Sequence, residues 1–299
     1  MARTGKPLTL KVFGRHKRDG EKLVVLTAYD LTSALIASAG GVDALLVGDS
    51  VGMVVLGHEN TLPVTMDDMV HHCQAVARAR PQIPIIADMP YGSFHVSAEQ
   101  TVEHALRLVK QGGAHAVKVE GGQQRTAVIE ALIAAEIPVM GHLGLTPQSI
   151  NRLGGYTVQG RDAATAEQLR QDARLLADLG CFALVLECVP SSLATAVSAE
   201  INIPTIGIGA GAGCDGQVLV FHDMLGLFGG LKPKFVKQYA ALGELAEAAI
   251  AQYAAEVRDG QFPGAEHEYA EQTSPGKVAD KKAAEGKSGY LNELEAERD

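Results

Sequence analysis

The stretch IPIIADMPYGSFHVSAEQTVEHALRLVKQGGAHAVKVE, residues 83–120, decides the fold of this chain. Two short apolar runs, residues 83–87 and 116–119, flank a segment with helical spacing of its apolar residues, 98–111. A strand, a helix and a second strand in this order predict a right-handed crossover between parallel strands. Near-continuous apolar strands are typical of a sheet that is covered on both faces. The stretch therefore predicts an α/β fold with a parallel sheet.

The same alternation recurs along most of the chain. Six further apolar, β-branched runs bounded by glycine or proline predict strands: residues 23–27, 44–48, 137–141, 183–186, 204–208 and 217–221. Eight such units match a closed (β/α)8 TIM barrel better than an open doubly wound sheet, which commonly has five or six strands. The link at about residues 210–216 departs from this pattern, because it is too short for a full crossover helix.

The two ends of the chain carry separate predictions. Residues 8–18 have the pattern of a short amphipathic helix, which we expect to cover the N-terminal end of the barrel. We expect residues 1–270 to form the catalytic barrel domain. In residues 271–299, 12 of 29 residues are charged and few are large and apolar, so this segment is predicted to be a disordered tail without a role in the chemistry.

Composition excludes several classes of partner. The net charge is -9, and the longest basic run is residues 15–18, so the sequence predicts neither a nucleic-acid-binding nor a membrane-surface protein. An anionic substrate would therefore need a local positive centre. The four cysteines show no CxxC spacing, and no signal segment or membrane span is indicated. We expect a cytoplasmic protein with reduced thiols.

Four carboxylates stand at the ends of predicted strands: Asp49 in LLVGDS, Asp88 in IIADMP, Glu120 in VKVEGG and Glu187 in LVLECVP. In a parallel barrel these ends meet at one rim. Each residue taken alone is equally consistent with a helix cap or a surface ion pair. Four converging carboxylates, however, raise one another's pKa and destabilise the ionised site unless a cation is bound.

A hard cation such as Mg²⁺ suits oxygen donors without His or Cys. The strands of Asp49, Asp88 and Glu120 are consecutive, so these residues can share one ion, whereas Glu187 is expected across the barrel mouth, with a small substrate between them. Lys118 lies two residues before Glu120 and points the same way. It either forms a structural pair with Glu120 or supplies the positive charge that binds a substrate carboxylate.

These residues predict the enolisation of a 2-oxo acid. Such an acid chelates a metal ion through its carboxylate and keto oxygens, and the ion stabilises the enolate by several kcal/mol. Glu187 would remove the proton. His142 in GHLGL is expected to face the site, where a structural and a catalytic role are both open. The run GIGAGAG, residues 207–213, favours a tight turn over an anion-binding nest.

The chain resembles the ketopantoate hydroxymethyltransferase family in a set of motifs that occur in order between about residues 5 and 270. The motifs are LVGDSVGMVVLGHENTLPVT, IIADMPYGSF, VKVEGG, GHLGLTPQS, GGYTVQGR, LVLECVP and IGIGAG..CDGQVLVFHDMLG. The resemblance implies a Mg²⁺-dependent barrel enzyme of pantothenate biosynthesis. Its reaction transfers a hydroxymethyl group from 5,10-methylenetetrahydrofolate to 3-methyl-2-oxobutanoate, which gives 2-dehydropantoate. A cytoplasmic homo-oligomer, commonly a decamer, is also implied.

Matched motif by motif, the resemblance assigns roles to single residues. The metal ligands fall on Asp49, Asp88 and Glu120, the substrate contacts on Asp49, Ser50, Asp88 and Lys118, and the proton acceptor on Glu187. The nearest alternative is another Mg²⁺-dependent 2-oxo acid lyase or mutase, but such an enzyme predicts a nucleophilic lid cysteine or a phosphonate substrate. A non-catalytic barrel that binds keto acids is the alternative from a different class.

Overall fold

A computed structural model describes residues 7–230 and 233–269. The chain divides into two compact units, Met1–Ala248 and Ala249–Asp299. The first unit contains every strand of the described residues and the residues to which the sequence assigns chemistry. The expected tail at 271–299 lies outside the described residues, and the domain boundary at 270 stays a prediction.

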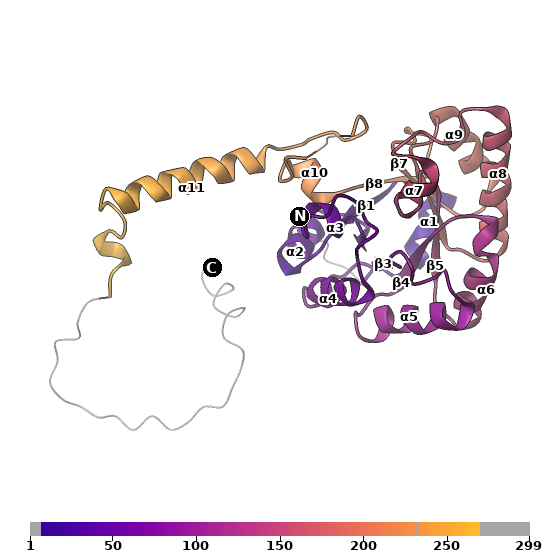
Figure 1. Cartoon of the computed structure of the whole chain (residues 1–299), viewed down its shortest axis with the longest axis horizontal. Helices are drawn as coiled ribbons and strands as arrows, with labels where there is room; N and C mark the ends of the chain where they lie inside the picture. The colour runs from indigo at the N-terminus through magenta and orange to yellow at the C-terminus, as the bar shows by residue number, and fades with distance from the viewer. Residues whose placement is uncertain (1–6, 231–232, 270–299) are drawn as a thin grey trace, which may run out of the picture. The chain divides into compact units, whose positions relative to one another are not determined.

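A closed parallel barrel forms the centre of the first unit (Figure 1). Each strand pairs in parallel with the next one along the chain, and β8 pairs with β1. The strands are β1 (Leu23–Thr27), β2 (Ala44–Val47), β3 (Ile85–Asp88), β4 (Ala116–Glu120), β5 (Val139–Gly144), β6 (Ala183–Glu187), β7 (Thr205–Ile208) and β8 (Gly216–Leu219). The predicted (β/α)8 fold and all eight predicted strands are confirmed.

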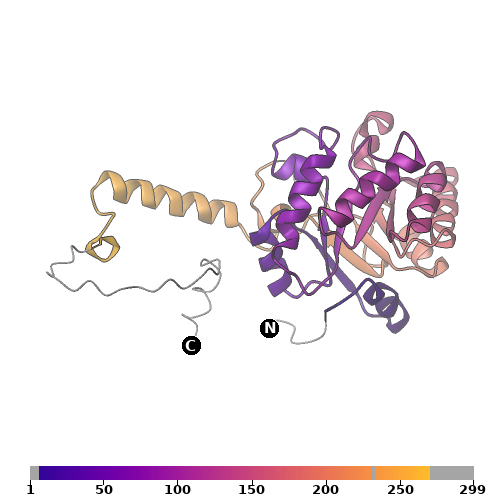
Figure 2. The same cartoon turned by 90° about the horizontal axis from the view of Figure 1, so that it is seen from below.

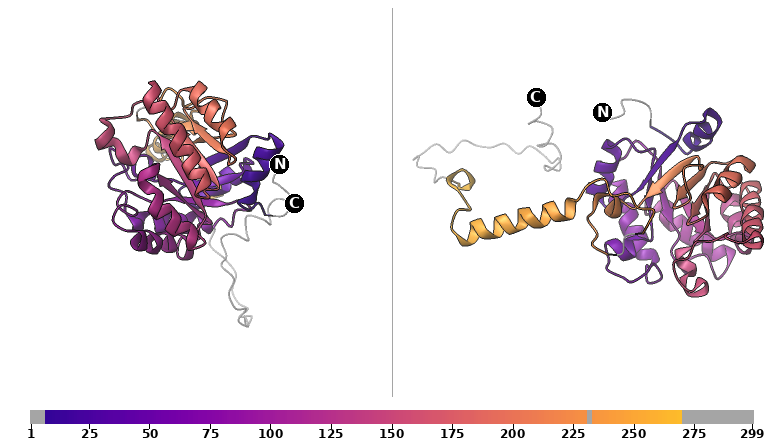
Figure 3. Two further views of the ribbon diagram at one scale, coloured as in Figure 1. Left: turned by 90° about the vertical axis from the view of Figure 1, so that its right-hand side faces the viewer. Right: turned by 90° about the horizontal axis from the view of Figure 1, so that it is seen from above.

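Helices follow most strands and cover the outside of the barrel (Figures 1 and 3). The α-helices are α1 (Lys11–Asp19), α2 (Leu31–Ala39), α3 (Val51–Val54), α4 (Met66–Ala77), α5 (Ala98–Lys110), α6 (Thr126–Ala134), α7 (Ile150–Leu153), α8 (Ala163–Asp178), α9 (Ser191–Glu200), α10 (Phe221–Leu225) and α11 (Leu242–Arg258). Short 3₁₀ turns are η1 (Gln123–Arg125), η2 (Pro147–Ser149) and η3 (Ala265–His267). Residues 209–215, between β7 and β8, contain no helix, as their length predicts.

Several helices begin at polar residues that the sequence places just before them. Asp30 precedes α2, Thr65 precedes α4 and Ser97 precedes α5, and each side chain accepts a hydrogen bond from a backbone N–H in the first turn. Asp162 does the same for α8. Caps of this kind satisfy N–H groups that have no partner inside the helix, so they set where each crossover begins.

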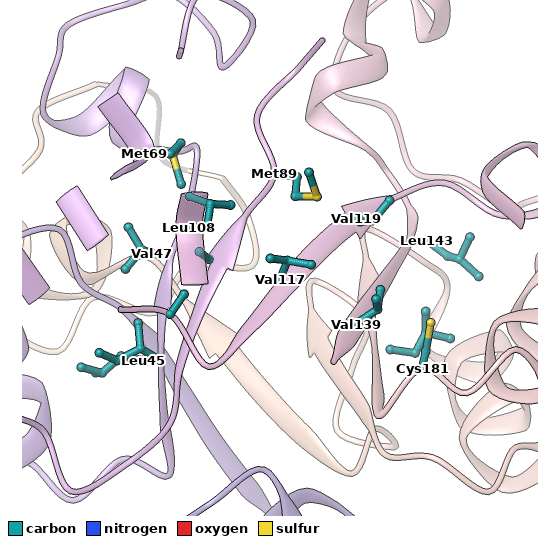
Figure 4. Close-up of a cluster of buried hydrophobic side chains, with 14 of the residues drawn as sticks. Leu45, Val47, Met69, Met89, Leu108, Val117, Val119, Val139, Leu143 and Cys181 are labelled. Carbon is teal, nitrogen blue, oxygen red and sulfur yellow. The ribbon is translucent and has the colours of Figure 1, made fainter. Parts of the chain in front are cut away.

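The main hydrophobic core lies between the strands and the surrounding helices (Figure 4). Val47 of β2, Val117 of β4 and Val139 of β5 face outward and belong to the same buried cluster as Met69 of α4 and Leu108 of α5. Each of these side chains is almost fully buried. Because residues of opposite parity on the same strands face inward, the strands are apolar on both faces, as the uninterrupted runs predict.

Helix α1 closes one end of the barrel, as expected (Figure 2). Phe13 is fully buried among inward-facing residues such as Leu23 and Met140 and meets the ring of Phe182 edge to face. This cluster fills the interior at the end where the strands begin. The polar chemistry is therefore confined to the opposite rim. Among the described residues, no helix has the length and apolar character that crossing a membrane requires.

Candidate active site

The strand register gathers the predicted site residues at the C-terminal rim of the barrel. Asp88, Glu120 and Glu187 are the last residues of β3, β4 and β6, and Asp49 follows β2 by two positions. Asp88 is in register with Lys118. In the same way Glu120 is opposite His142, and Gly144 is opposite Glu187. Residues that are far apart in the sequence thus become neighbours around one ring.

Asp49 and Asp88 are joined directly. The backbone N–H of Asp49 donates a hydrogen bond to Oδ2 of Asp88 over 3.0 Å, and both side chains are buried. Gly48 makes room for this approach, because a Cβ there would lie 2.9 Å from Oγ of Ser50 and 3.4 Å from Oδ2 of Asp88. The Ser50 hydroxyl in turn lies 2.8 Å from the hydroxyl of Tyr29. The turn after β2 therefore presents Asp49 and Ser50 beside Asp88.

Lys118 provides the positive centre that an acidic chain needs for an anionic substrate. Its side chain is buried, and Nζ lies 3.1 Å from Oδ1 of Asp88 and 3.1 Å from Nδ1 of His142. Burial alone would lower the pKa of Lys118, but the carboxylates of Asp88, Glu120 and Asp49 raise it above its ordinary value. The ammonium is therefore charged at neutral pH. Its ion-pair partner in the structure is Asp88 rather than the Glu120 considered from the sequence.

His142 connects the two sides of the site. Nδ1 lies 3.3 Å from Oε1 of Glu120, and Nε2 lies 3.2 Å from Oε2 of Glu187. Burial and the charge of Lys118 lower the pKa of His142, but the two glutamates outweigh them and raise it overall. Burial would raise the pKa of Glu120, yet the hydrogen bond and charge of His142 bring it below its ordinary value. His142 therefore faces the site, as expected, and holds both glutamates.

Gln148 is a site residue that sequence reasoning missed. Its side-chain Nε2 donates to Oδ2 of Asp49 over 2.8 Å and to the carbonyl of Met89 over 2.9 Å. Its backbone N–H donates to Oε2 of Glu120 over 3.1 Å. The only available signal was its place in the motif GHLGLTPQS, because a loop residue has no periodicity that predicts where its side chain points.

The long connection after β5, residues 145–161, passes over the mouth of the barrel. Besides Gln148, it is anchored where the backbone N–H of Gln159 donates to the carbonyl of Cys188, next to Glu187, over 2.9 Å. Between these anchors, the hydroxyl of Tyr156 lies 3.7 Å from Sδ of Met53 in α3. The loop therefore joins the rims of β5, β2 and β6.

The donor set fits a hard divalent cation. Oδ1 of Asp88 and Oε1 of Glu120 are buried, and each faces a nitrogen, Nζ of Lys118 at 3.1 Å and Nδ1 of His142 at 3.3 Å, which leaves each oxygen a lone pair for a cation. Burial, with the charges of Asp88 and Glu120, raises the pKa of Asp49 well above its ordinary value. Within residues 7–230 and 233–269, no three His, Cys, Asp or Glu side chains are already arranged as a metal shell. The metal-binding roles therefore stay predictions.

The raised pKa of Asp49 predicts how metal affinity depends on pH. A cation must displace the proton that this buried carboxyl holds more tightly than a free one, so affinity should rise with pH until Asp49 is ionised. We expect the Mn²⁺ dissociation constant to fall by up to about tenfold per pH unit in that range. Mn²⁺ titrations from pH 5 to pH 8 measure this dissociation constant. In the Asp49→Asn variant the dissociation constant should change less with pH. A flat wild-type profile would contradict the prediction.

Comparisons with known proteins identify the family of the chain. A family model described as ketopantoate hydroxymethyltransferase matches residues 7–265. A protein of Moorella thermoacetica called 3-methyl-2-oxobutanoate hydroxymethyltransferase is 54% identical over 262 residues, which cover 88% of this chain and 97% of that protein. A protein of the same name from Carboxydothermus hydrogenoformans is 52% identical over 262 residues, which cover 88% of this chain and 95% of that protein.

Solved structures share the fold at lower sequence identity. A 2,3-dimethylmalate lyase of the PEP mutase/isocitrate lyase superfamily has a TM-score of 0.55 and 19% identity, over 88% of this chain and 92% of that chain. A phosphonopyruvate hydrolase complex with oxalate and Mg²⁺ has a TM-score of 0.55 and 13% identity, over 86% of this chain and 92% of that chain. At such identities the likeness shows the fold alone. The family model and the close relatives show more: the chain is an enzyme and belongs to the ketopantoate hydroxymethyltransferase family.

Proposed function

We propose that the enzyme transfers a hydroxymethyl group from 5,10-methylenetetrahydrofolate to 3-methyl-2-oxobutanoate, in pantothenate biosynthesis. The product is 2-dehydropantoate, and one water molecule supplies the hydroxyl oxygen. The observation that carries this proposal is a buried ammonium, Lys118, set among carboxylates with Glu187 on the far side of His142. Such a site can bind a small 2-oxo acid and take a proton from it.

The keto acid would bind between the rims of β2 and β4. Its carboxylate would lie near Lys118, whose ammonium is in contact with Asp88, and the Ser50 hydroxyl can donate to the same ligand. Asp49, Asp88 and Glu120 would hold Mg²⁺. When bound, the ion supplies Lewis-acid stabilisation to the oxyanion that develops on the keto oxygen.

Glu187 would remove the proton from C3 of the keto acid. Its side chain is 15% exposed, so it is reachable from the mouth, and His142 holds its Oε2 in place. The C3 carbanion then forms the new carbon–carbon bond with the one-carbon unit. Over the whole reaction both bonds from that carbon to the two folate nitrogens break, water supplies the hydroxyl group, and the nitrogens take up one proton from water and one from Glu187. The loop 145–161 would limit the access of water while this carbanion exists.

Turnover tests the proposal directly. Purified protein with Mg²⁺, 3-methyl-2-oxobutanoate and methylenetetrahydrofolate should produce 2-dehydropantoate and tetrahydrofolate in equal amounts, which liquid chromatography with mass spectrometry can quantify. Chelation of the metal should stop the reaction, and added Mg²⁺ should restore it. Product formation that persists without the folate donor, or full activity after chelation, would count against the proposed donor or the proposed metal.

The alternative lyase or mutase activity is less favoured. That class predicts a reactive cysteine near the site, and Cys188, adjacent to Glu187, is the described cysteine that comes closest in sequence. Burial and then the charge of Glu187 raise the pKa of Cys188 to about 11, so its thiol is protonated and weakly nucleophilic at neutral pH. The family match also favours transfer over this alternative.

We further propose that the protein works as a cytoplasmic homo-oligomer, with a decamer as the expected assembly. Ile250, Tyr253 and Val257 in α11 are 65%, 55% and 44% exposed, and their spacing puts them on one face of the helix. An apolar helix face of this kind favours association with another surface. Sedimentation analysis at several protein concentrations measures the assembly, and a monomer throughout would contradict it.

A further inference from the structure

Gln148 contacts each of the three segments that carry the proposed metal ligands. Its amide nitrogen bonds to the side chain of Asp49 and to the carbonyl of Met89, the residue after Asp88. Its backbone N–H bonds to the side chain of Glu120. Both neighbours of the amide nitrogen are acceptors, so the orientation of the amide follows from chemistry. One residue of the loop 145–161 thus holds the rims of β2, β3 and β4 together.

The carbonyl oxygen of the same amide has no partner. Gln148 is 5% exposed, and its Oε1 is buried without a hydrogen bond to any described residue. A buried acceptor without a hydrogen bond destabilises the fold, because the hydration that it loses on burial is not replaced. The two hydrogen bonds that the amide nitrogen donates explain an ordinary loop anchor, but they do not explain the buried acceptor on the same amide. The open acceptor instead suits a donor that arrives with a ligand, such as water bound to a cation.

The positions of the two acceptors give the second half of the argument. Asp49 and Glu120 are buried, and one oxygen of each accepts a hydrogen bond from Gln148. A cation held by the same two carboxylates would fix their positions, and the two hydrogen bonds would then hold the loop residue in place. Metal occupancy and the position of the loop are thereby linked through this single residue.

We propose that Gln148 is a positioning residue that couples divalent-cation binding to closure of the loop 145–161 over the barrel mouth. This inference rests on the metal site of the proposed function and adds a role for a loop residue. The coupling is reciprocal: if the cation stabilises the closed loop, the closed loop must raise cation affinity by the same factor. A glutamine without this role would affect neither quantity.

Cation affinity is the first test. We expect Gln148→Met, which keeps length and removes the amide, to weaken Mn²⁺ binding by about 10–100-fold, the usual effect of losing a group that orients metal ligands. Gln159→Met is the matched control, because that side-chain amide lies in the same loop and, among the described residues, bonds only to Thr157. Its Mn²⁺ affinity should stay within about twofold of wild type. Electron paramagnetic resonance of free Mn²⁺ measures the Mn²⁺ affinities of both variants without substrate or turnover.

Loop closure is the second test, and it does not require a variant. Hydrogen exchange followed by mass spectrometry should show that Mg²⁺ protects peptides from residues 145–161 in wild type but leaves those of α5 unchanged. Gln159→Met should keep this protection, and Gln148→Met should lose most of it. Absence of Mg²⁺-dependent protection in wild type would overturn the coupling, even if Gln148→Met failed to fold.

The outcomes separate this inference from the proposed function. Wild-type protein that binds no Mn²⁺ at all would refute the metal site itself. Wild-type protein that binds Mn²⁺, with Gln148→Met folded and equal to it in affinity and loop protection, would refute only the role of Gln148. Folding of the variant is checked by its circular dichroism spectrum and its melting temperature.

Discussion

Glu187→Gln is expected to reduce the exchange of the C3 proton of 3-methyl-2-oxobutanoate to the background rate. The substitution keeps the shape of the side chain and its contact distance to His142 but removes the carboxylate that accepts the proton. Loss of a general base typically costs about 10²–10⁴-fold in rate, so both exchange and hydroxymethyl transfer should fall by that factor. Incubation with Mg²⁺ in D₂O, followed by ¹H NMR, reports the exchange without the folate donor.

Keto acid binding shows whether Glu187→Gln has lost only the general base or the whole substrate site. Glu187→Gln should bind the keto acid within a few-fold of wild type, because Lys118, Asp49 and Asp88 are unchanged. Glu167→Gln is a suitable control, since that residue pairs with Arg174 on the surface of α8. Exchange at the wild-type rate in Glu187→Gln would show that another group is the base.

Asp88→Asn is expected to abolish Mg²⁺-dependent binding of the keto acid. Asp88 accepts the backbone N–H of Asp49 through Oδ2 and pairs with Lys118 through Oδ1, so one substitution removes a proposed metal ligand and the partner of a buried ammonium. Removing one member of a buried ion pair costs about 3–5 kcal/mol, because the other charge is left uncompensated. Separately from this cost in stability, we expect a loss of keto acid affinity of at least about 100-fold, because the cation that the keto acid chelates would lose one of its ligands.

Isothermal titration calorimetry in the presence and absence of Mg²⁺ measures this loss. The matched control is Asp67→Asn, because Asp67 forms its ion pair with Arg107 at the surface of α4 and α5, where such pairs contribute little. Its keto acid affinity should be unchanged. Wild-type affinity and wild-type Mg²⁺ dependence in Asp88→Asn would remove Asp88 from the site, and with it the assignment of Lys118 as the substrate's counter-charge.

The barrel was predictable because its signals are local. An apolar run such as residues 183–186 buries both faces of a strand wherever it pairs, and a segment such as 98–111 has one apolar face that must cover a sheet. Strand ends were less predictable. The expected strand at 137–141 became β5, Val139–Gly144, because its pairing with β6 continues as far as Glu187. The last residues of a strand depend on the neighbour that offers hydrogen-bond partners.

The residues that form the candidate site could be predicted from the sequence, but the contacts between them could not. Carboxylates at strand ends indicated which side chains share the rim, and alternation placed Lys118 on the same side as Glu120. Which groups touch depends on barrel register. Register puts Lys118 against Asp88 and His142 between the two glutamates, and no local pattern encodes it.

By itself, the sequence determined the parallel barrel, the closing helix α1, and the rim on which Asp49, Asp88, Glu120 and Glu187 lie. Each of these follows from hydrophobic periodicity and from the common direction of parallel strands. Only the tertiary structure decided that Gln148 reaches back from a loop to the segments of all three proposed metal ligands. The physical reason is that a loop side chain is positioned by distant partners, which become neighbours only when the barrel has closed.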